Sequence, residues 1–166
     1  MRKDPNSGGS EEEIRAQTVV LDDLRGTLDG VVDMINTIEG TRAQLVTLRR
    51  VLAADSTRKG LAAEADSVEQ KLIAVEEDLV QLRLTGRGQD DVRYPMKLMG
   101  RLGWLADGMT TADFAPTSQQ KEVLAGFKAL AAADRGKLTE LLTKEVAGFN
   151  QKLRERGVQN IVAGSH

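Results

Sequence analysis

Apolar residues recur every three or four positions over most of this 166-residue chain, and this period limits the fold more than any other feature. The most regular run has alternating steps of four and three: Leu61, Ala65, Val68, Leu72, Val75, Leu79 and Leu82. Such spacing lines one side of a helix with apolar side chains, and three heptads of it indicate coiled-coil-like packing. Only 3% of the residues are aromatic, which suits helices that meet along narrow seams better than a sheet. The chain is therefore predicted to be all-α.

A first long helix is predicted from Glu11 to Ala54. Ser10 suits its N-cap, and Glu13 three residues later completes a capping box. One apolar face follows, with polar residues at two skipped positions: Ile14, Gln17, Leu21, Leu24, Leu28, Val31, Ile35, Ile38, Arg42, Leu45 and Leu52. The phase is kept through Gly40, so we expect one continuous helix of roughly 65 Å. A bend at Gly40 is the alternative.

The second helix is predicted to cover the regular seam and to end at Gly86 and Gly88, because glycine adopts the left-handed conformation of a helix C-cap. Residues 89–94 should be extended, since Pro95 disfavours helix at the residue before it. Pro95 itself suits the first position of a short third helix that ends near Thr110. The inward side chains of this helix are expected to be Met99, Leu102, Leu105, Ala106 and Met109.

The fourth helix is predicted to begin at a second capping box, formed by Thr117 and Gln120, and to end at Gly157. Its apolar positions are Leu124, Phe127, Leu130 or Ala131, Leu138, Leu141 or Leu142, Val146, Phe149 and Leu153. Beyond it, Ile161 and Val162 are expected to fold back onto the end of the bundle.

The predicted lengths favour an elongated antiparallel helical bundle of three long rods, each about 60 Å. The second and third helices together match the first or the fourth, so the middle rod is broken at Gly86–Tyr94 and the bundle has four helices. A compact four-helix bundle, folded at Gly40, is the second choice. The bundle domain is assigned to residues 10–163, after a linker at 1–9, and residues 164–166 are interpreted as the remnant of a purification tag.

The residue types that catalysis, metal binding or a cofactor would need are largely missing. There is no cysteine, and the only histidine is His166. Acidic groups such as Asp22 and Asp23 are adjacent in sequence, so on a helix they diverge instead of converging on one ion. No catalytic, cofactor-binding or metal-binding residue is therefore assigned. Asp134 lies near the apolar phase of the fourth helix, and we expect its carboxylate to reach water at the edge of the seam.

Charge and hydropathy exclude two further classes of partner. Acidic and basic residues nearly balance, for a net charge of −2, whereas a nucleic-acid-binding protein needs a basic excess on one face. No apolar stretch approaches the roughly 18 residues of a membrane span. Residues 1–40 hold nine acids against four bases. We expect this acidic part to face the basic middle of the chain across the bundle.

The predicted break in the middle rod carries the candidate partner contacts. Positive charge gathers there at Arg83, Arg87, Arg93, Lys97 and Arg101. We expect Asp90 and Asp91 to pair locally with these side chains; the alternative is that the cluster binds an anion or a partner. Tyr94 and Trp104, the only large amphipathic aromatic residues, are candidate anchors of such an interface. A lone Trp at helical spacing from core residues is more often core itself, and this is what we expect of Trp104.

Three stretches resemble a known type of domain: Lys3-Asp4-Pro5 followed by Glu13-Ile14-Arg15-Ala16-Gln17; Lys71-Leu72 to Leu82-Arg83; and Asp91-Val92-Arg93-Tyr94-Pro95-Met96-Lys97-Leu98, leading through Leu102 to Ala115-Pro116-Thr117. They resemble the C-terminal helical region of bacterial proteins built on a BNR/Asp-box repeat β-propeller. These are sortilin-like and sialidase-like proteins, often labelled glycosyl hydrolases. The resemblance implies a domain appended to the propeller of an exported protein. Catalytic or ligand-binding residues would lie in the propeller, and no Asp box occurs in this chain, so no functional residue is carried over.

The expected function is a non-catalytic structural or interaction module that braces such a propeller or binds a protein partner. The candidate contacts are Arg87, Arg93, Tyr94, Lys97, Arg101 and Trp104. Homo-oligomerisation through exposed parts of the heptad seams is the alternative. A small enzyme or ligand carrier is the third hypothesis, and it requires a pocket in the bundle with convergent polar groups.

Overall fold

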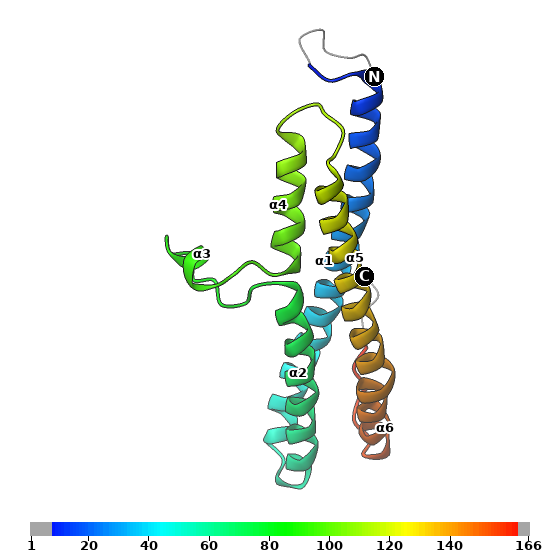
Figure 1. Cartoon of the computed structure of the whole chain (residues 1–166). Coiled ribbons are helices and arrows are strands. Elements are labelled where there is room, and N and C mark those ends of the chain that lie inside the picture. The colour runs from blue at the N-terminus through cyan, green and yellow to red at the C-terminus, as the bar shows by residue number, and fades with distance from the viewer. Residues whose placement is uncertain (1–7, 163–166) are drawn as a thin grey trace.

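The computed structural model describes residues 8–162, and all regular secondary structure in this part of the chain is helical. The helices are α1 (Glu11–Ala53), η1 (Ser56–Arg58), α2 (Lys59–Leu79), α3 (Asp90–Arg93), α4 (Leu98–Thr110), α5 (Ser118–Glu140), η2 (Leu141–Val146) and α6 (Ala147–Glu155). They form three adjacent rods: α1, then α2 and α4 in succession, then α5 continued by η2 and α6 (Figure 1). The predicted elongated all-α bundle with a broken middle rod is confirmed.

The first rod follows its predicted course. α1 runs unbroken through Gly40, so the alternative of a compact bundle folded at that residue is wrong. The Glu13 N–H donates to Ser10 Oγ (3.1 Å), and the Ser10 N–H donates to the Glu13 carboxylate (2.8 Å). These two bonds complete the predicted capping box. The buried side of the helix follows the predicted stripe, with Ile38 and Leu45 fully buried.

Both helices of the middle rod pack against α1, each along a different half of it (Figure 1). α2 buries Leu72 and Leu79 along the C-terminal half of α1, while α4 buries Leu102 and Met109 along the N-terminal half. α5 contacts both of these helices and closes the core. A fully buried leucine side chain contributes about 2 kcal/mol, so the apolar seams hold the rods together.

Two polar residues of α1 lie at the positions that its apolar stripe skips. Gln17 is buried, and its Nε2 donates to the carbonyl groups of Met109 and, at 2.7 Å, Ala112. These carbonyls lie at the end of α4, where a helix leaves its own acceptors unpaired. Arg42 donates to the buried carboxylate of Glu76 on α2. Both polar residues thus connect α1 to the middle rod.

A second set of ion pairs lies one heptad along α1. Arg49 contacts Asp66 and, at 3.0 Å, the buried Glu69 of α2. Arg49 follows Arg42 by seven residues, and Glu69 precedes Glu76 by seven. In an antiparallel pair of helices these spacings match. The contacts Arg42–Glu76 and Arg49–Glu69 are therefore compatible with the same register of α1 and α2.

The third rod begins at the second predicted capping box. The Gln120 N–H donates to Thr117 Oγ1 (3.2 Å), and the Thr117 N–H donates to the Gln120 side chain (2.9 Å). The sequence left open whether Leu130 or Ala131 is the apolar position that faces the core. Ala131 is buried and Leu130 is exposed. The segment η2 is a π-helix, whose wider turn separates α5 from α6 without breaking the rod.

The C-terminal segment folds back as predicted, apart from one side chain. Gly157 (φ 64°) ends the rod in the left-handed conformation. Ile161 is buried, and its backbone both donates to the Asn150 side chain (2.9 Å) and accepts from it (2.8 Å). The backbone of Val162 makes the same two-way contact with Gln44 on α1. The Val162 side chain, however, is exposed.

The break in the middle rod is longer than predicted. α2 ends at Leu79 instead of Gly86, and Val80 is already extended (φ −136°, ψ 148°). The reason is tertiary, because α4 occupies the position beside α1 that a longer α2 would need (Figure 1). Leu82, the last residue of the regular seam, therefore leaves the core and is 40% exposed.

The segment before α4 also differs from its prediction. Asp90–Arg93 forms one helical turn instead of extended chain, and it is closed by a bond from the Tyr94 N–H to the Asp90 carbonyl (2.7 Å). Only Tyr94, directly before Pro95, is extended. Pro95 is not the first helical residue, since α4 begins at Leu98.

Residues 1–7 and 163–166 lie outside the described part of the chain, and with them most of the predicted linker and the whole predicted tag remnant. Between residues 8 and 162, none of the helices combines the length and the apolar character that crossing a membrane requires.

Candidate partner-binding site

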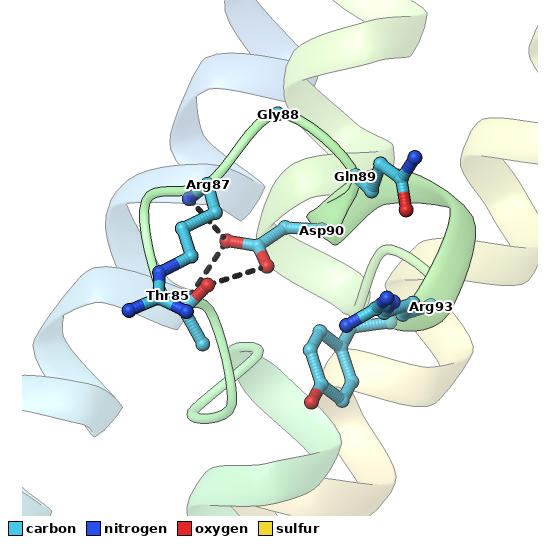
Figure 2. A pocket seen from close by; sticks show the side chains of 7 residues that line it. Thr85, Arg87, Gly88, Gln89, Asp90 and Arg93 are labelled. Carbon is cyan, nitrogen blue, oxygen red and sulfur yellow. Dashed lines mark hydrogen bonds between the residues drawn. The ribbon is translucent and has the colours of Figure 1, made fainter.

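Between α2 and α4 the chain leaves the bundle as a projection, which we define as residues 80–97 (Figure 1). Asp90 fixes its shape. One carboxylate oxygen accepts hydrogen bonds from the N–H groups of Thr85 (2.7 Å), Gly86 (2.7 Å) and Arg87 (3.3 Å). The other accepts from the Thr85 hydroxyl at 2.9 Å (Figure 2). Gly86 supplies the positive φ of 74° at this tight turn.

Asp90 is ionised at neutral pH. Desolvation on its own would raise the pKa of its carboxyl group, but the hydrogen bonds outweigh it. The bonds from Thr85, then those from Gly86 and Arg87, favour the charged form and hold the pKa below its ordinary value of 3.8. The prediction that Asp90 pairs with basic side chains is wrong, because backbone N–H groups occupy its carboxylate. The side chain of Asp91 lies outside what the structure describes.

The projection surrounds a first hollow of about 410 Å³. Its lining residues are Thr85, Arg87, Gly88, Gln89, Asp90, Arg93 and Tyr94. Figure 2 shows Arg87 and Arg93 on either side of Asp90, with the carboxylate turned toward the loop. The hollow is therefore flanked by two guanidinium groups.

Two further hollows adjoin the first, since each shares lining residues with its neighbour. The second, of about 260 Å³, is lined by Glu77, Gln81, Arg83, Arg93, Tyr94, Pro95 and Lys97. The third, of about 270 Å³, is lined by Asp78, Lys97, Leu98, Arg101, Leu130, Asp134 and Lys137. Arg93 and Tyr94 belong to the first two hollows, and Lys97 belongs to the second and third. We name these three adjoining hollows, taken together, the basic groove.

The basic groove contains six cations and four carboxylates. Two of the cations are paired: Arg83 lies 3.7 Å from Glu77, and Lys137 contacts two carboxylates. The other four have no ion pair with any side chain that the structure describes: Arg87, Arg93, Lys97 and Arg101. Arg101 donates from Nε to the Met96 carbonyl (3.0 Å), which leaves its charge unpaired.

Asp134 is buried, so the prediction that its carboxylate reaches water is wrong. The Lys137 ammonium, one turn further along α5, donates to Asp134 (2.8 Å) and to Asp78 on α2 (2.9 Å). These bonds, that of Asp134 first, raise the pKa of Lys137 above its ordinary value of 10.5. The lysine therefore stays protonated at neutral pH, where it fastens α5 to the end of α2.

Trp104 is 72% exposed, so the prediction that it belongs to the core is wrong. α4 buries Leu102 and Met109 against the other rods, and Trp104 lies on its outer side. Arg101 and Trp104, three residues apart, lie on one face of the helix, and Lys97 is its N-cap residue. Trp104 lines none of the three hollows, but it extends their cationic side along α4.

Exposed apolar side chains accompany these cations. Twelve large apolar side chains of the described chain are exposed, and five of them lie between residues 82 and 104. These five are Leu82, Leu84, Val92, Met96 and Trp104. Apolar groups gathered on a surface beside polar ones mark sites of interaction, whereas single exposed ones are ordinary.

The acidic first part of α1 does not supply counter-charges to the basic groove. Asp23 pairs with Lys128 of α5 (2.6 Å), and Asp29 pairs with Arg25 of α1 itself (4.0 Å). Among the described residues, no ion pair joins residues 8–40 to residues 83–101. The predicted pairing of these two parts across the bundle is therefore absent from this part of the chain.

The cations and hydrogen-bond donors of the basic groove are groups that can bind anions. Guanidinium, ammonium, amide and hydroxyl groups donate hydrogen bonds, and the best-placed lysine is held in its protonated form. Among the acidic side chains that the structure describes, no three lie close enough to hold a metal ion.

Five of the six predicted contact residues meet in the basic groove: Arg87, Arg93, Tyr94, Lys97 and Arg101. The role of Asp90 was not predicted, and neither was the contribution of α5 through Leu130, Asp134 and Lys137. An aspartate shortly after Gly86 and Gly88 is a turn signal that could have indicated the closed loop. No signal in the sequence places residues of α5 beside the projection.

The comparisons with known proteins give no relative. No family model matches the chain, and neither a curated protein nor a solved structure matches it. The geometry described above is therefore the guide to function.

Proposed function

We propose that this chain is a non-catalytic helical interaction domain that binds a protein partner through the projection and the outer face of α4. The observation that carries the proposal is the presence of exposed apolar side chains beside unpaired cations. Trp104 (72% exposed) lies one turn after Arg101, and Met96 (44% exposed) lies two residues before the helix begins. Trp and Arg are the residue types that most often dominate the energy of protein interfaces.

The three rods support this surface rigidly. Buried leucines and the Arg42–Glu76 contact hold α2 on α1, and Lys137 ties α5 to α2 below the projection. A surface held in place loses less conformational entropy on binding than a mobile one. Such a support favours docking of a folded partner. Lys137, held as a cation by Asp134 and Asp78, serves in this proposal to support the surface and not to react.

For the partner, we propose a β-propeller of the same parent protein, which this domain would brace outside the cytoplasm. The support is the resemblance of the three stretches quoted above, one of which, residues 91–98, spans the outer part of the projection and the start of α4. Because the comparisons found no relative, this support comes from the sequence alone.

Calorimetric titration of this chain with an isolated propeller of such a protein tests the proposal. We expect saturable binding, with a shift of Trp104 fluorescence to shorter wavelength as the exposed indole leaves water. Because this is the only Trp of the chain, its signal reports on one face. A propeller with its own Trp residues requires that 5-fluorotryptophan be placed in this chain alone and followed by NMR.

A pair of variants locates the contact. Trp104→Ser should weaken binding by about 2 kcal/mol, as expected for an interface anchor. Val19→Ser, at another exposed apolar position (69% exposed) on α1, should not change it. Absence of heat at high concentration of both proteins contradicts propeller bracing. Light scattering that finds a dimer with a shielded Trp104 would assign this face to a second copy of the chain instead.

A further inference from the structure

The form of the basic groove limits the ligand that it accepts, and this inference rests on the proposed function. The three hollows, of about 410, 260 and 270 Å³, follow one another through the shared residues Arg93, Tyr94 and Lys97. A small anion would occupy only part of one hollow. A series of adjoining hollows suits an extended chain that lies across all of them.

Unpaired cations recur along the whole length of the basic groove. Arg87 and Arg93 line the first hollow, and Arg93 and Lys97 line the second. Lys97 and Arg101 line the third. Each hollow therefore offers at least two positive charges that no described carboxylate neutralises. An occupant with negative charges at intervals along its length would pair with them one after another.

We propose that the basic groove binds an extended acidic segment of a protein partner, whose Asp and Glu side chains pair with Arg87, Arg93, Lys97 and Arg101. Guanidinium groups present a planar fork that matches a carboxylate with two parallel hydrogen bonds. Gln89, which is exposed in the first hollow, can in addition bond to the backbone of such a segment.

Asp90 prepares the basic groove for this ligand. Its carboxylate is held by Thr85, Gly86 and the N–H of Arg87, so the loop is closed without use of a guanidinium group. The cations therefore stay available, and the loop does not have to be ordered when the ligand arrives. Organisation before binding lowers the entropic cost of association.

A nucleic acid is the other elongated anion, and the structure favours the acidic polypeptide over it. The net charge of −2 disfavours both polyanions equally, so the number of aromatic residues in the groove decides between them. Proteins that bind single-stranded nucleic acid stack successive bases on several aromatic rings. Tyr94 is the one aromatic residue that lines the groove, and it is half-buried.

Fluorescence anisotropy with a labelled oligoglutamate peptide tests the inference on the whole chain. We expect saturable binding at low salt, and no binding of an oligolysine peptide of equal length. Salt of about 1 M shortens the screening length to about 3 Å and should release the peptide. Absence of oligoglutamate binding at low salt overturns the inference, and so does tighter binding of a single-stranded oligodeoxynucleotide.

Charge reversal identifies the groove as the site. Arg93→Glu, at the residue shared by two hollows, should weaken oligoglutamate binding about tenfold, which corresponds to 1.4 kcal/mol. Lys121→Glu makes the same change in net charge in the first turn of α5, where an acidic residue suits the helix, and should leave binding unchanged. Equal losses in both variants would mean non-specific attraction and would overturn the inference. Unchanged unfolding of Arg93→Glu shows that a loss is not due to misfolding.

This test and that of the proposed function can fail separately. If oligoglutamate does not bind while a folded partner still binds in a Trp104-dependent way, the inference about the groove is wrong and the interaction domain stands. If oligoglutamate binds in an Arg93-dependent way while the propeller does not, the groove stands and the choice of partner is wrong.

Discussion

The hairpin of α1 and α2 and the projection both depend on carboxylates, but they use them in opposite ways. In the hairpin, the buried Glu69 and Glu76 contact arginines on the other helix. In the projection, which interrupts the middle rod, Asp90 bonds to N–H groups of its own loop. Where carboxylates meet guanidinium groups, charge fixes the register of two helices. Where a carboxylate meets backbone, the neighbouring cations stay free for a ligand.

The two regions also differ in what holds them together. Leu72 in the hairpin is fully buried, whereas Leu84 in the projection is 54% exposed. Loss of packing should therefore be costly in the hairpin and nearly neutral in the projection. The following predictions test this contrast, from the largest expected effect to the smallest.

Truncation of the two leucines should give very different results. Leu72→Ala removes fully buried methyl groups and leaves a cavity, so it should lower the free energy of unfolding by about 3 kcal/mol. Leu84→Ala should change it by less than about 0.5 kcal/mol. Urea unfolding followed by circular dichroism at the helix bands measures both. Equal losses would mean that the projection is part of the cooperative core.

Removal of the arginine from the buried ion pair should cost less than the leucine and should depend on pH. Desolvation already raises the pKa of Glu76, and the contact with Arg42 opposes this shift. Arg42→Met leaves the carboxylate unpaired and should destabilise the fold by about 2 kcal/mol at neutral pH, since Arg42 is only partly buried.

The sign of the pH effect follows from the raised pKa. A carboxyl whose folded pKa lies above its unfolded value opposes folding when it is charged, and this cost disappears as the pH falls through the folded pKa. The deficit of Arg42→Met should thus shrink as the pH falls from 7 toward the ordinary value of 4.5. Glu76→Gln, the matched control, should lose less at pH 7 and show no such recovery. A deficit that is independent of pH would mean that Glu76 is not the cause.

Loss of the Asp90 carboxylate should have the smallest effect on the whole molecule. Asp90→Asn should speed hydrogen exchange at the amides of Thr85, Gly86 and Arg87, because their charged acceptor is gone. The midpoint of global unfolding should not change. Asp107→Asn, at an exposed position of α4, is the control and should leave these amides protected.

Acid should act on the wild-type loop in the same way. The pKa of Asp90 is lowered, so its stabilising effect is present above the ordinary value of 3.8 and is lost as the pH falls below it through the lowered value. Exchange at these three amides, corrected for its intrinsic pH dependence, should therefore stay slow between pH 5 and 7. Loss of protection already near pH 5 would contradict the assigned role of Asp90.

The candidate site could be predicted only as far as it is local in sequence. Arg87, Arg93, Tyr94, Lys97 and Arg101 all come from one short segment, so their clustering is visible in the chain itself. The third hollow, by contrast, is completed by side chains of α5. Which residues of a later helix reach a loop depends on how the rods align, and that alignment is a property of the packed molecule.

The sequence by itself determined the helices that depend on near neighbours. The capping boxes at Ser10 and Thr117 and the stop at Gly157 use atoms within a few residues of one another, and each formed as predicted. The unbroken apolar stripe likewise carried α1 through Gly40, because helical phase is set by spacing along the chain.

Only the tertiary structure decided at which residue a helix with a continuing apolar period ends. The seam of α2 continues in sequence to Leu82, but α4 takes the place beside α1, and the helix ends at Leu79. The packing of the rods likewise leaves Trp104 exposed and Asp134 buried. A side chain is buried when another rod packs against its face of the helix, and exposed when none does. The period of the sequence determines which residues share a face, but it does not determine which rod covers that face.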